Sequence, residues 1–111
     1  MTKPKDPRDL AIALLSRSIC SVQVGAVLAD KWGIFGWGWN SSGDGLGEHA
    51  EAACLRRGNR KRFPLSTLYV AAARLRNGKP VTARPCPACG AKLKKVGRVC
   101  WRDGTGLWRT D

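Results

Sequence analysis

The hydrophobic pattern of the chain predicts short helices and strands that alternate along most of its length. A first helix is expected to start at Asp9, because apolar residues recur at helical spacing after it. Apolar positions then alternate with small or polar ones over residues 21–30, and a turn over 30–33 leads into a second strand over 34–39. Together these two strands predict a β-hairpin.

The second strand of this hairpin alternates aromatic residues with glycine. Phe35, Trp37 and Trp39 are expected on one face, and Gly36 and Gly38 on the other. Because glycine has no side chain, the glycine face leaves room for another segment to approach the backbone closely.

Five further elements complete the pattern. They are a helix over 48–57 closed by Gly58, a strand over 68–73, a helix over 87–95, and strands over 98–102 and 107–110. The strand over 68–73 is apolar on both faces, which is typical of the centre of a sheet covered by helices on both sides. The order predicts an α/β fold of three layers, in which a mixed five-stranded sheet has helices on both faces.

Length and cysteine content argue against a multidomain protein and against a secreted, disulfide-bonded one. The 111 residues (12.1 kDa) have room for one compact domain, 1–111, in which residues 1–8 form a flexible leader. The apolar runs are too short for a membrane span. Five cysteines are an odd number, whereas a secreted disulfide framework normally uses an even one. We therefore expect a cytoplasmic protein with free thiols.

Positive charge is concentrated in the second half of the chain. Residues 1–55 carry five basic and six acidic side chains, and residues 56–111 carry fifteen and two. An excess of this size favours a phosphate-bearing partner, nucleic acid or nucleotide, over an ordinary solvated surface. The candidate phosphate contacts are Arg56, Arg57, Arg60, Lys61, Arg62 and Arg84.

Two short clusters carry the chemistry: His49-Ala50-Glu51 and Pro85-Cys86-Pro87-Ala88-Cys89. Each opens a predicted helix, and a helix N-terminus lowers the pKa of a thiol, so Cys86 and Cys89 would bind metal as thiolates. With His49 they make three ligands, the number a catalytic zinc takes when its fourth position is kept for water. Glu51 can face that water and carry its proton to a substrate nitrogen.

A structural zinc ribbon or a redox-active CxxC is the alternative interpretation. A ribbon needs a fourth protein ligand, and the candidates are Cys54 and Cys100. Cys54 lies more than a helical turn after His49, and Cys100 lies within a strand as a small core residue. The combined HxE…PCxxC pattern instead matches the known signature of zinc nucleobase deaminases, which favours a catalytic zinc.

From about residue 10 to 108 the sequence resembles the cytidine/deoxycytidylate deaminase superfamily. The matching segments are Gly38-Trp39-Asn40, His49-Ala50-Glu51, Leu68-Tyr69-Val70 and Pro85-Cys86-Pro87-Ala88-Cys89. The resemblance implies the α-β-α fold of cytidine deaminases and one zinc ion held by His49, Cys86 and Cys89, with Glu51 as proton shuttle. It also implies hydrolytic attack at cytosine C4 or adenine C6 with release of ammonia.

The resemblance further implies contacts to the substrate. Asn40 matches a position that contacts the sugar, and Ala50 and Pro85 match positions whose backbone groups face the base. From their positions in the sequence, Trp39 and Trp101 are the tryptophans best placed to reach the pocket. The Gly-Trp-Asn segment is also similar to tRNA adenosine deaminases, and an antiparallel last strand is similar to free cytidine deaminases.

The leading hypothesis is an enzyme that deaminates cytosine to uracil in single-stranded nucleic acid, with DNA favoured, because basic and aromatic residues together hold single strands. The alternatives are a free nucleotide (dCMP- or cytidine-type) deaminase, a tRNA adenosine deaminase-like enzyme, and a non-enzymatic, zinc-stapled nucleic-acid-binding module. No membrane partner is expected, and oligomer formation stays open.

Overall fold

The computed structural model describes residues 6–41, 49–84 and 93–110. Helices and strands follow one another much as the sequence predicts, with two short 3₁₀ helices added. The elements are α1 (Pro7–Ala13), η1 (Leu14–Arg17), β1 (Val22–Asp30), β2 (Gly33–Trp39), α2 (Ala50–Arg57), η2 (Arg60–Leu65), β3 (Thr67–Arg74), β4 (Pro80–Val81), β5 (Arg98–Arg102) and β6 (Trp108–Thr110).

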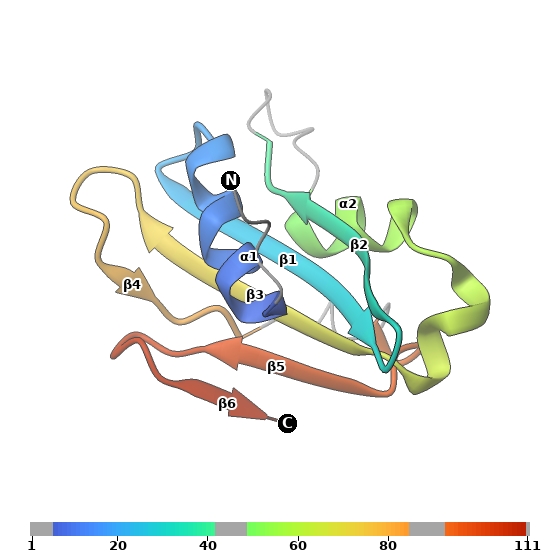
Figure 1. The fold of residues 1–111 in the computed structure, drawn as a ribbon. Helices are drawn as coiled ribbons and strands as arrows, with labels where there is room; N and C mark the ends of the chain where they lie inside the picture. Colours follow the sequence, from blue (N-terminus) through green and yellow to red (C-terminus); the bar gives the residue numbers. More distant parts are fainter. Residues whose placement is uncertain (1–5, 42–48, 85–92, 111) are drawn as a thin grey trace.

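The strands form one mixed sheet with the spatial order β2-β1-β3-β5-β6 (Figure 1). The β3–β5 pair is parallel, whereas β1–β2, β1–β3 and β5–β6 are antiparallel. The described residues contain six strands, one more than the sequence predicts, because β4 also pairs with β3. A strand of two residues is too short to show an alternating pattern.

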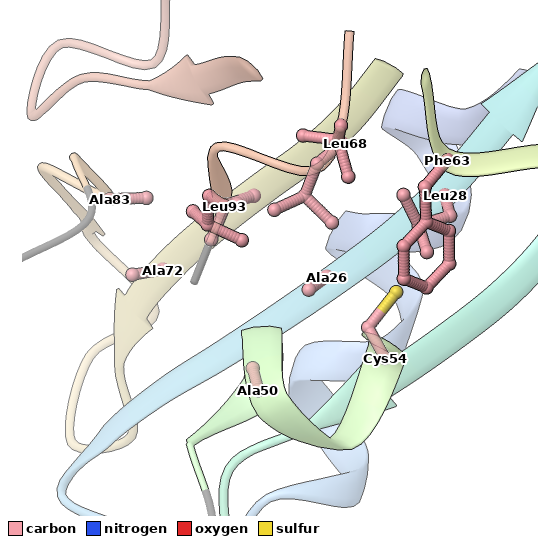
Figure 2. Packing of buried hydrophobic residues seen from close by; sticks show 11 residues of the cluster. Ala26, Leu28, Ala50, Cys54, Phe63, Leu68, Ala72, Ala83 and Leu93 are labelled. Carbon is pink, nitrogen blue, oxygen red and sulfur yellow. The ribbon is translucent and has the colours of Figure 1, made fainter. Parts of the chain in front are cut away.

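Helices α1 and α2 cover opposite faces of the sheet (Figure 1), which confirms the predicted layers. On one face, Ala11 and Leu14 pack against Val27 and Ala71; we call this the α1-side cluster. On the other face, α2 packs into a larger α2-side cluster (Figure 2). Its buried members are Ala26, Leu28, Ala50, Cys54, Phe63, Leu68, Val70, Ala72, Ala83, Leu93 and Val96.

Strand β3 lies in the middle of the sheet and is buried on both faces, as its sequence predicts. Leu68, Val70 and Ala72 belong to the α2-side cluster, whereas Ala71 belongs to the α1-side cluster. Full burial of a valine or leucine side chain contributes about 1.5–3 kcal/mol. This strand therefore joins the two halves of the core.

Phe35 does not lie on the same face as Trp39, contrary to the sequence prediction. The pairing of β1 with β2 shifts between residues 28 and 29, so Phe35 is the extra residue of a β-bulge. Its ring packs with the α2-side cluster, 6.3 Å from the ring centroid of Phe63. Trp39 packs against the α1-side cluster. A bulge inverts the alternation that the prediction assumed.

The glycine face of β2 is covered by α2, which confirms the predicted close approach. A Cβ atom at Gly38 would lie 2.6 Å from the backbone nitrogen of Cys54 and 2.7 Å from Cβ of Ala53. At Gly36 it would lie 3.1 Å from the Cys54 carbonyl oxygen. The helix can therefore lie directly on the strand only because both residues are glycine.

The start of α1 differs from the prediction. The helix begins at Pro7, and the Asp6 carboxylate accepts a hydrogen bond from the Arg8 backbone N–H at 2.8 Å. Asp6 is therefore the N-cap, and Asp9 lies within the first turn. Residues 6–8, which the sequence assigned to a flexible leader, are part of the helix and its cap.

The end of α2 also differs. Gly58 follows the helix as expected, but its φ of −82° is an ordinary extended conformation. A Cβ there would lie 2.9 Å from Cδ1 of Leu28 and 3.0 Å from the Phe63 ring. Glycine is therefore needed at this position for space in the core rather than for a left-handed helix cap.

The predicted helix over 87–95 lies mostly outside the described residues, as do Pro85, Cys86 and Cys89. In the part of the chain that is described, no helix is long and apolar enough to cross a membrane.

Replacing Gly38 with alanine tests the contact between α2 and β2. Because the new methyl group would overlap the helix backbone, we expect Gly38→Ala to lower the free energy of unfolding by about 2–3 kcal/mol, measured by urea denaturation. Gly104→Ala is the matched control, since its nearest neighbour would be 3.9 Å away and its effect should stay within about 0.5 kcal/mol. Equal stability of the two variants would contradict the close-contact account.

Candidate active site

The start of α2 lies against one end of the sheet. His49 is the N-cap residue, with extended backbone angles, and its carbonyl accepts the hydrogen bond of the Ala53 N–H at 3.0 Å. The His49 side chain is exposed, and Glu51 in the first turn is only 8% exposed. Within the cluster His49-Ala50-Glu51, the first residue is therefore exposed and the last is buried.

A cavity of about 230 Å³ opens at this point. Its volume is below the usual range for drug-sized ligands, so it suits a small ring. It brings together residues from β1, β3, the end of β2, the start of α2 and the segment after β4. The lining residues are Val22, Val24, Asn40, His49, Ala50, Glu51, Ala72, Thr82, Ala83 and Arg84.

Five predicted site residues from three separate parts of the sequence line this one cavity: Asn40, His49, Ala50, Glu51 and Arg84. Among residues 6–41, 49–84 and 93–110, the Glu51 carboxylate has no hydrogen-bond or ion-pair partner. Its position in the first turn of α2 places the negative charge where the helix dipole stabilises it.

The Asn40 side chain is held by hydrogen bonds on both of its polar atoms. Its Oδ1 accepts from the Ser18 hydroxyl at 2.6 Å and from the Val24 N–H at 2.8 Å. Its Nδ2 donates to the Val22 carbonyl at 2.8 Å. Two donors on one atom and an acceptor on the other fix which end of the amide is oxygen. Within the described ranges, the second Nδ2 hydrogen has no acceptor.

The hydrogen bond from Ser18 to Asn40 could not be predicted from the sequence. Ser18 is only 2% exposed, lies outside any repeating motif, and is 22 residues away from Asn40. A serine before a strand has many common roles, so only the tertiary structure shows that its hydroxyl orients Asn40.

The segment that leads to the predicted cysteines is anchored at the cavity. The Ala83 N–H donates to the Arg102 carbonyl at 2.9 Å, and Nη2 of the buried Arg102 donates to the Ala72 carbonyl at 3.2 Å. Arg84, which lines the cavity, immediately precedes residues 85–92 in the sequence. Beyond them, Leu93 belongs to the same cluster as Ala83 (Figure 2).

The donor set fits a zinc ion. His49 lies at the cavity, and the chain passes from the cavity wall at Arg84 towards Cys86 and Cys89, which lie outside the described residues. One imidazole and two thiolates are ligands that zinc prefers. The described residues by themselves contain no group of three candidate metal ligands.

The other cysteines have different surroundings. Cys54 is fully buried beneath Phe63 (Figure 2), and burial raises the pKa of its thiol to about 12, which disfavours a thiolate ligand. Cys54 is not among the described residues that line the cavity, which fits its place more than a helical turn after His49. Cys100 is half-buried rather than a full core residue, and its Sγ lies 3.4 Å from the Thr110 hydroxyl on β6.

Neither predicted tryptophan is among the described residues that line the cavity. Trp39 packs on the α1-side cluster, and the guanidinium groups of Arg17 and Arg57 lie 5.7 Å and 5.0 Å from its ring centroid. Trp101 packs on the α2-side cluster. Both tryptophans therefore pack against the hydrophobic clusters.

Most of the predicted phosphate contacts lie at the far end of α2. Arg56 and Arg57 are in its last turn, roughly 10 Å along the helix from His49, and Arg60 and Lys61 are exposed on η2. Arg57 donates to the Trp37 carbonyl at 3.3 Å. Of the six candidates, Arg84 alone is among the described residues that line the cavity.

Arg62 is bound to another part of the fold. Its guanidinium contacts the Asp30 carboxylate at 2.6 Å and 2.7 Å and lies 4.2 Å from the Phe35 ring centroid. The hydrogen bonds from Arg62 lower the pKa of Asp30 from its ordinary value. This ion pair ties η2 to the β1–β2 hairpin.

Comparison with protein families decides the assignment. The family described as the cytidine and deoxycytidylate deaminase zinc-binding region matches residues 2–101. The chain belongs to this deaminase family. Its cofactor is one zinc ion. The family match shows a zinc-dependent deaminase of the hydrolase class.

Solved structures of deaminases share the fold. Cytidine deaminase from Burkholderia pseudomallei aligns with a TM-score of 0.72 and 22% identity, over 95% of this chain and 88% of that one. Cytidine deaminase from Mycobacterium leprae aligns with a TM-score of 0.62 and 20% identity, over 93% and 88%. At these identities the likeness concerns the fold. No curated protein sequence matches the chain.

Removing the Ser18 hydroxyl tests how Asn40 is held. Because two hydrogen bonds are lost, one to the half-buried Asn40 amide and one from the Cys20 N–H, we expect Ser18→Ala to lower the free energy of unfolding by about 1–2 kcal/mol in urea denaturation. Ser16→Ala is the matched control, since the exposed Ser16 hydroxyl makes one local bond to the Ala13 carbonyl and its loss should cost less than about 0.5 kcal/mol. A Ser18→Ala variant as stable as the control would show that Asn40 does not depend on it.

Proposed function

We propose that this deaminase converts cytosine to uracil within single-stranded nucleic acid, with DNA favoured over RNA. The observation that carries the proposal is the small cavity lined by His49, Glu51 and Asn40, with Arg84 beside them. Deamination of a base in a phosphate-bearing nucleotide needs a proton carrier and a metal ligand for the reaction, and an amide donor and a positive charge for binding.

The proposed zinc ligands are His49, Cys86 and Cys89. Bound zinc would supply Lewis-acid activation of the water that enters the reaction. Glu51 accepts a proton from this water and delivers it to the amino nitrogen as the C4–N4 bond breaks. One water is consumed, ammonia is released, and C4 becomes a carbonyl carbon.

The low exposure of Glu51 suits this role. With 8% of its surface exposed, the carboxylate is largely shielded from bulk water, so the proton it carries is kept near the substrate. Its place in the first turn of α2, two residues after His49, keeps it near this proposed metal ligand.

Backbone and amide groups position the substrate in this proposal. Ala50 is the first residue of α2, so its N–H has no partner within the helix and can donate to an oxygen of the base. The remaining Nδ2 hydrogen of Asn40 can donate to a sugar oxygen. Pro85, which lies outside the described residues, would contribute a backbone group to the base.

The preference for a polymer rests on charge. Fifteen basic and two acidic residues over 56–111 exceed what one phosphate group needs, and Arg84 carries a positive charge to the cavity. A second candidate is deamination of free cytidine or its nucleotides, which the shared fold with cytidine deaminases favours.

The Glu51→Gln variant tests the proposal. We expect it to keep zinc and fold while kcat for cytosine deamination falls by about 10²–10⁴-fold, because the proton carrier is lost. The substrates are a cytosine-containing single-stranded oligodeoxynucleotide, its RNA counterpart, deoxycytidylate and cytidine, with uracil products measured by mass spectrometry.

Asp9→Asn, which makes the same chemical change at an exposed carboxylate, is the control and should keep kcat within about two-fold. Turnover of cytidine and deoxycytidylate without turnover of strands would overturn the polymer proposal. Zinc binding with no turnover of any substrate would favour a non-enzymatic binding module.

A further inference from the structure

A basic hairpin lies beyond the end of the sheet that holds the cavity. It joins β3 to β4 over residues 74–79, and we call it the rim hairpin. The Arg74 N–H donates to the Lys79 carbonyl at 3.0 Å, and the Gly78 N–H donates to the Arg74 carbonyl at 2.8 Å. Gly78 has a φ of +71°, which glycine adopts without strain. These bonds give the hairpin a defined shape.

The register of the sheet places the hairpin beside the cavity. Arg74 is paired with Val22, and Ala72 is paired with Val24. Val22, Val24 and Ala72 all line the cavity. Because alternate residues of a strand share a face, the Arg74 side chain lies on the same face as Ala72, next to Val22. The Leu75 N–H also donates to the Ser21 carbonyl at 3.0 Å.

The basic side chains of the rim hairpin have no acidic partner in the described part of the chain. Arg74, Arg76 and Lys79 are all exposed. The ion pairs among the described residues involve Arg8, Arg62 and Arg109 instead. Positive groups that are exposed and unpaired are the ones available to phosphate.

Apolar surface accompanies this charge. Leu75 in the hairpin is 52% exposed, and Ile19, in the neighbouring segment before β1, is 77% exposed. Sugars and bases of a single strand offer apolar surface between their phosphates, so the combination suits a strand better than a free anion.

We propose that the rim hairpin, together with Arg84, binds the phosphates of a single-stranded nucleic acid adjacent to the base in the cavity. This inference rests on the proposed function and locates its strand-binding surface. It replaces the cluster over 56–62 as the phosphate contact, because Arg62 is paired with Asp30 and the cluster follows α2 away from His49.

The test measures binding separately from catalysis. Full-length protein carrying Glu51→Gln is titrated with a fluorescein-labelled single-stranded oligodeoxynucleotide, and the dissociation constant is followed by anisotropy over a range of KCl concentrations. The rim variant is Arg74→Gln/Arg76→Gln/Lys79→Gln. The charge-matched control is Lys31→Gln/Lys95→Gln/Arg98→Gln, three exposed residues outside the hairpin, of which Arg98 pairs with Thr67 at the other end of β3.

We expect the rim variant to bind at least about 10-fold more weakly at 0.1 M salt, and the slope of log affinity against log salt to fall by about 2 for three lost phosphate contacts. The control should lose less than about three-fold in affinity and keep the slope. Arg76→Gln/Lys79→Gln, which leaves β3 intact, serves if the triple variant fails to fold.

Three results would overturn the inference. They are strand binding by the rim variant equal to that of its Glu51→Gln parent, a larger loss of strand affinity in Arg60→Gln/Lys61→Gln, and a rim effect on the binding of deoxycytidylate but not of strands. Strand binding that depends on the rim, without deamination by the wild type, would instead refute the proposed function and leave the inference standing. Equal deamination of strands by the wild type and by a rim variant that keeps Glu51 would refute the inference and leave the proposed function standing.

Discussion

The close contact between α2 and the glycine face of β2 is the constraint on which the site depends. Gly36 and Gly38 allow the helix backbone to lie where side chains would otherwise stand. The first turn of the helix therefore reaches the end of the sheet, with His49 at the surface and Glu51 in the interior. A helix held further from β2 would withdraw Glu51 from the cavity wall.

The two ends of α2 have different functions because their surroundings differ. At the start, His49, Ala50 and Glu51 line the cavity. At the end, Gly58 and Phe63 pack closely, and Arg62 is paired with Asp30. Of the basic residues near that end, Arg57 and Arg62 make contacts within the fold, to the Trp37 carbonyl and to Asp30. This division explains why the density of charge along the sequence does not mark the residues that line the cavity.

The sequence predicts much of the fold, because alternation and burial determine the strands. The strand over 98–102 agrees residue by residue, and β3 is central as expected. The face of Phe35 could not be predicted, since one bulge inverts the alternation. Of the site, His49, Glu51, Asn40 and Arg84 were found by motif and charge. Ser18 was missed, because its contact with Asn40 arises from long-range packing that no local pattern records.

The central claim is that the zinc has three protein ligands, one from the start of α2 and two from the segment after Arg84. Zinc analysis combined with X-ray absorption at the zinc edge tests this claim directly. The account predicts one zinc per chain with one nitrogen at about 2.0 Å, two sulfurs at about 2.3 Å and one further light atom. A shell of three or four sulfurs would contradict it, because Cys54 or Cys100 would then complete a closed structural site.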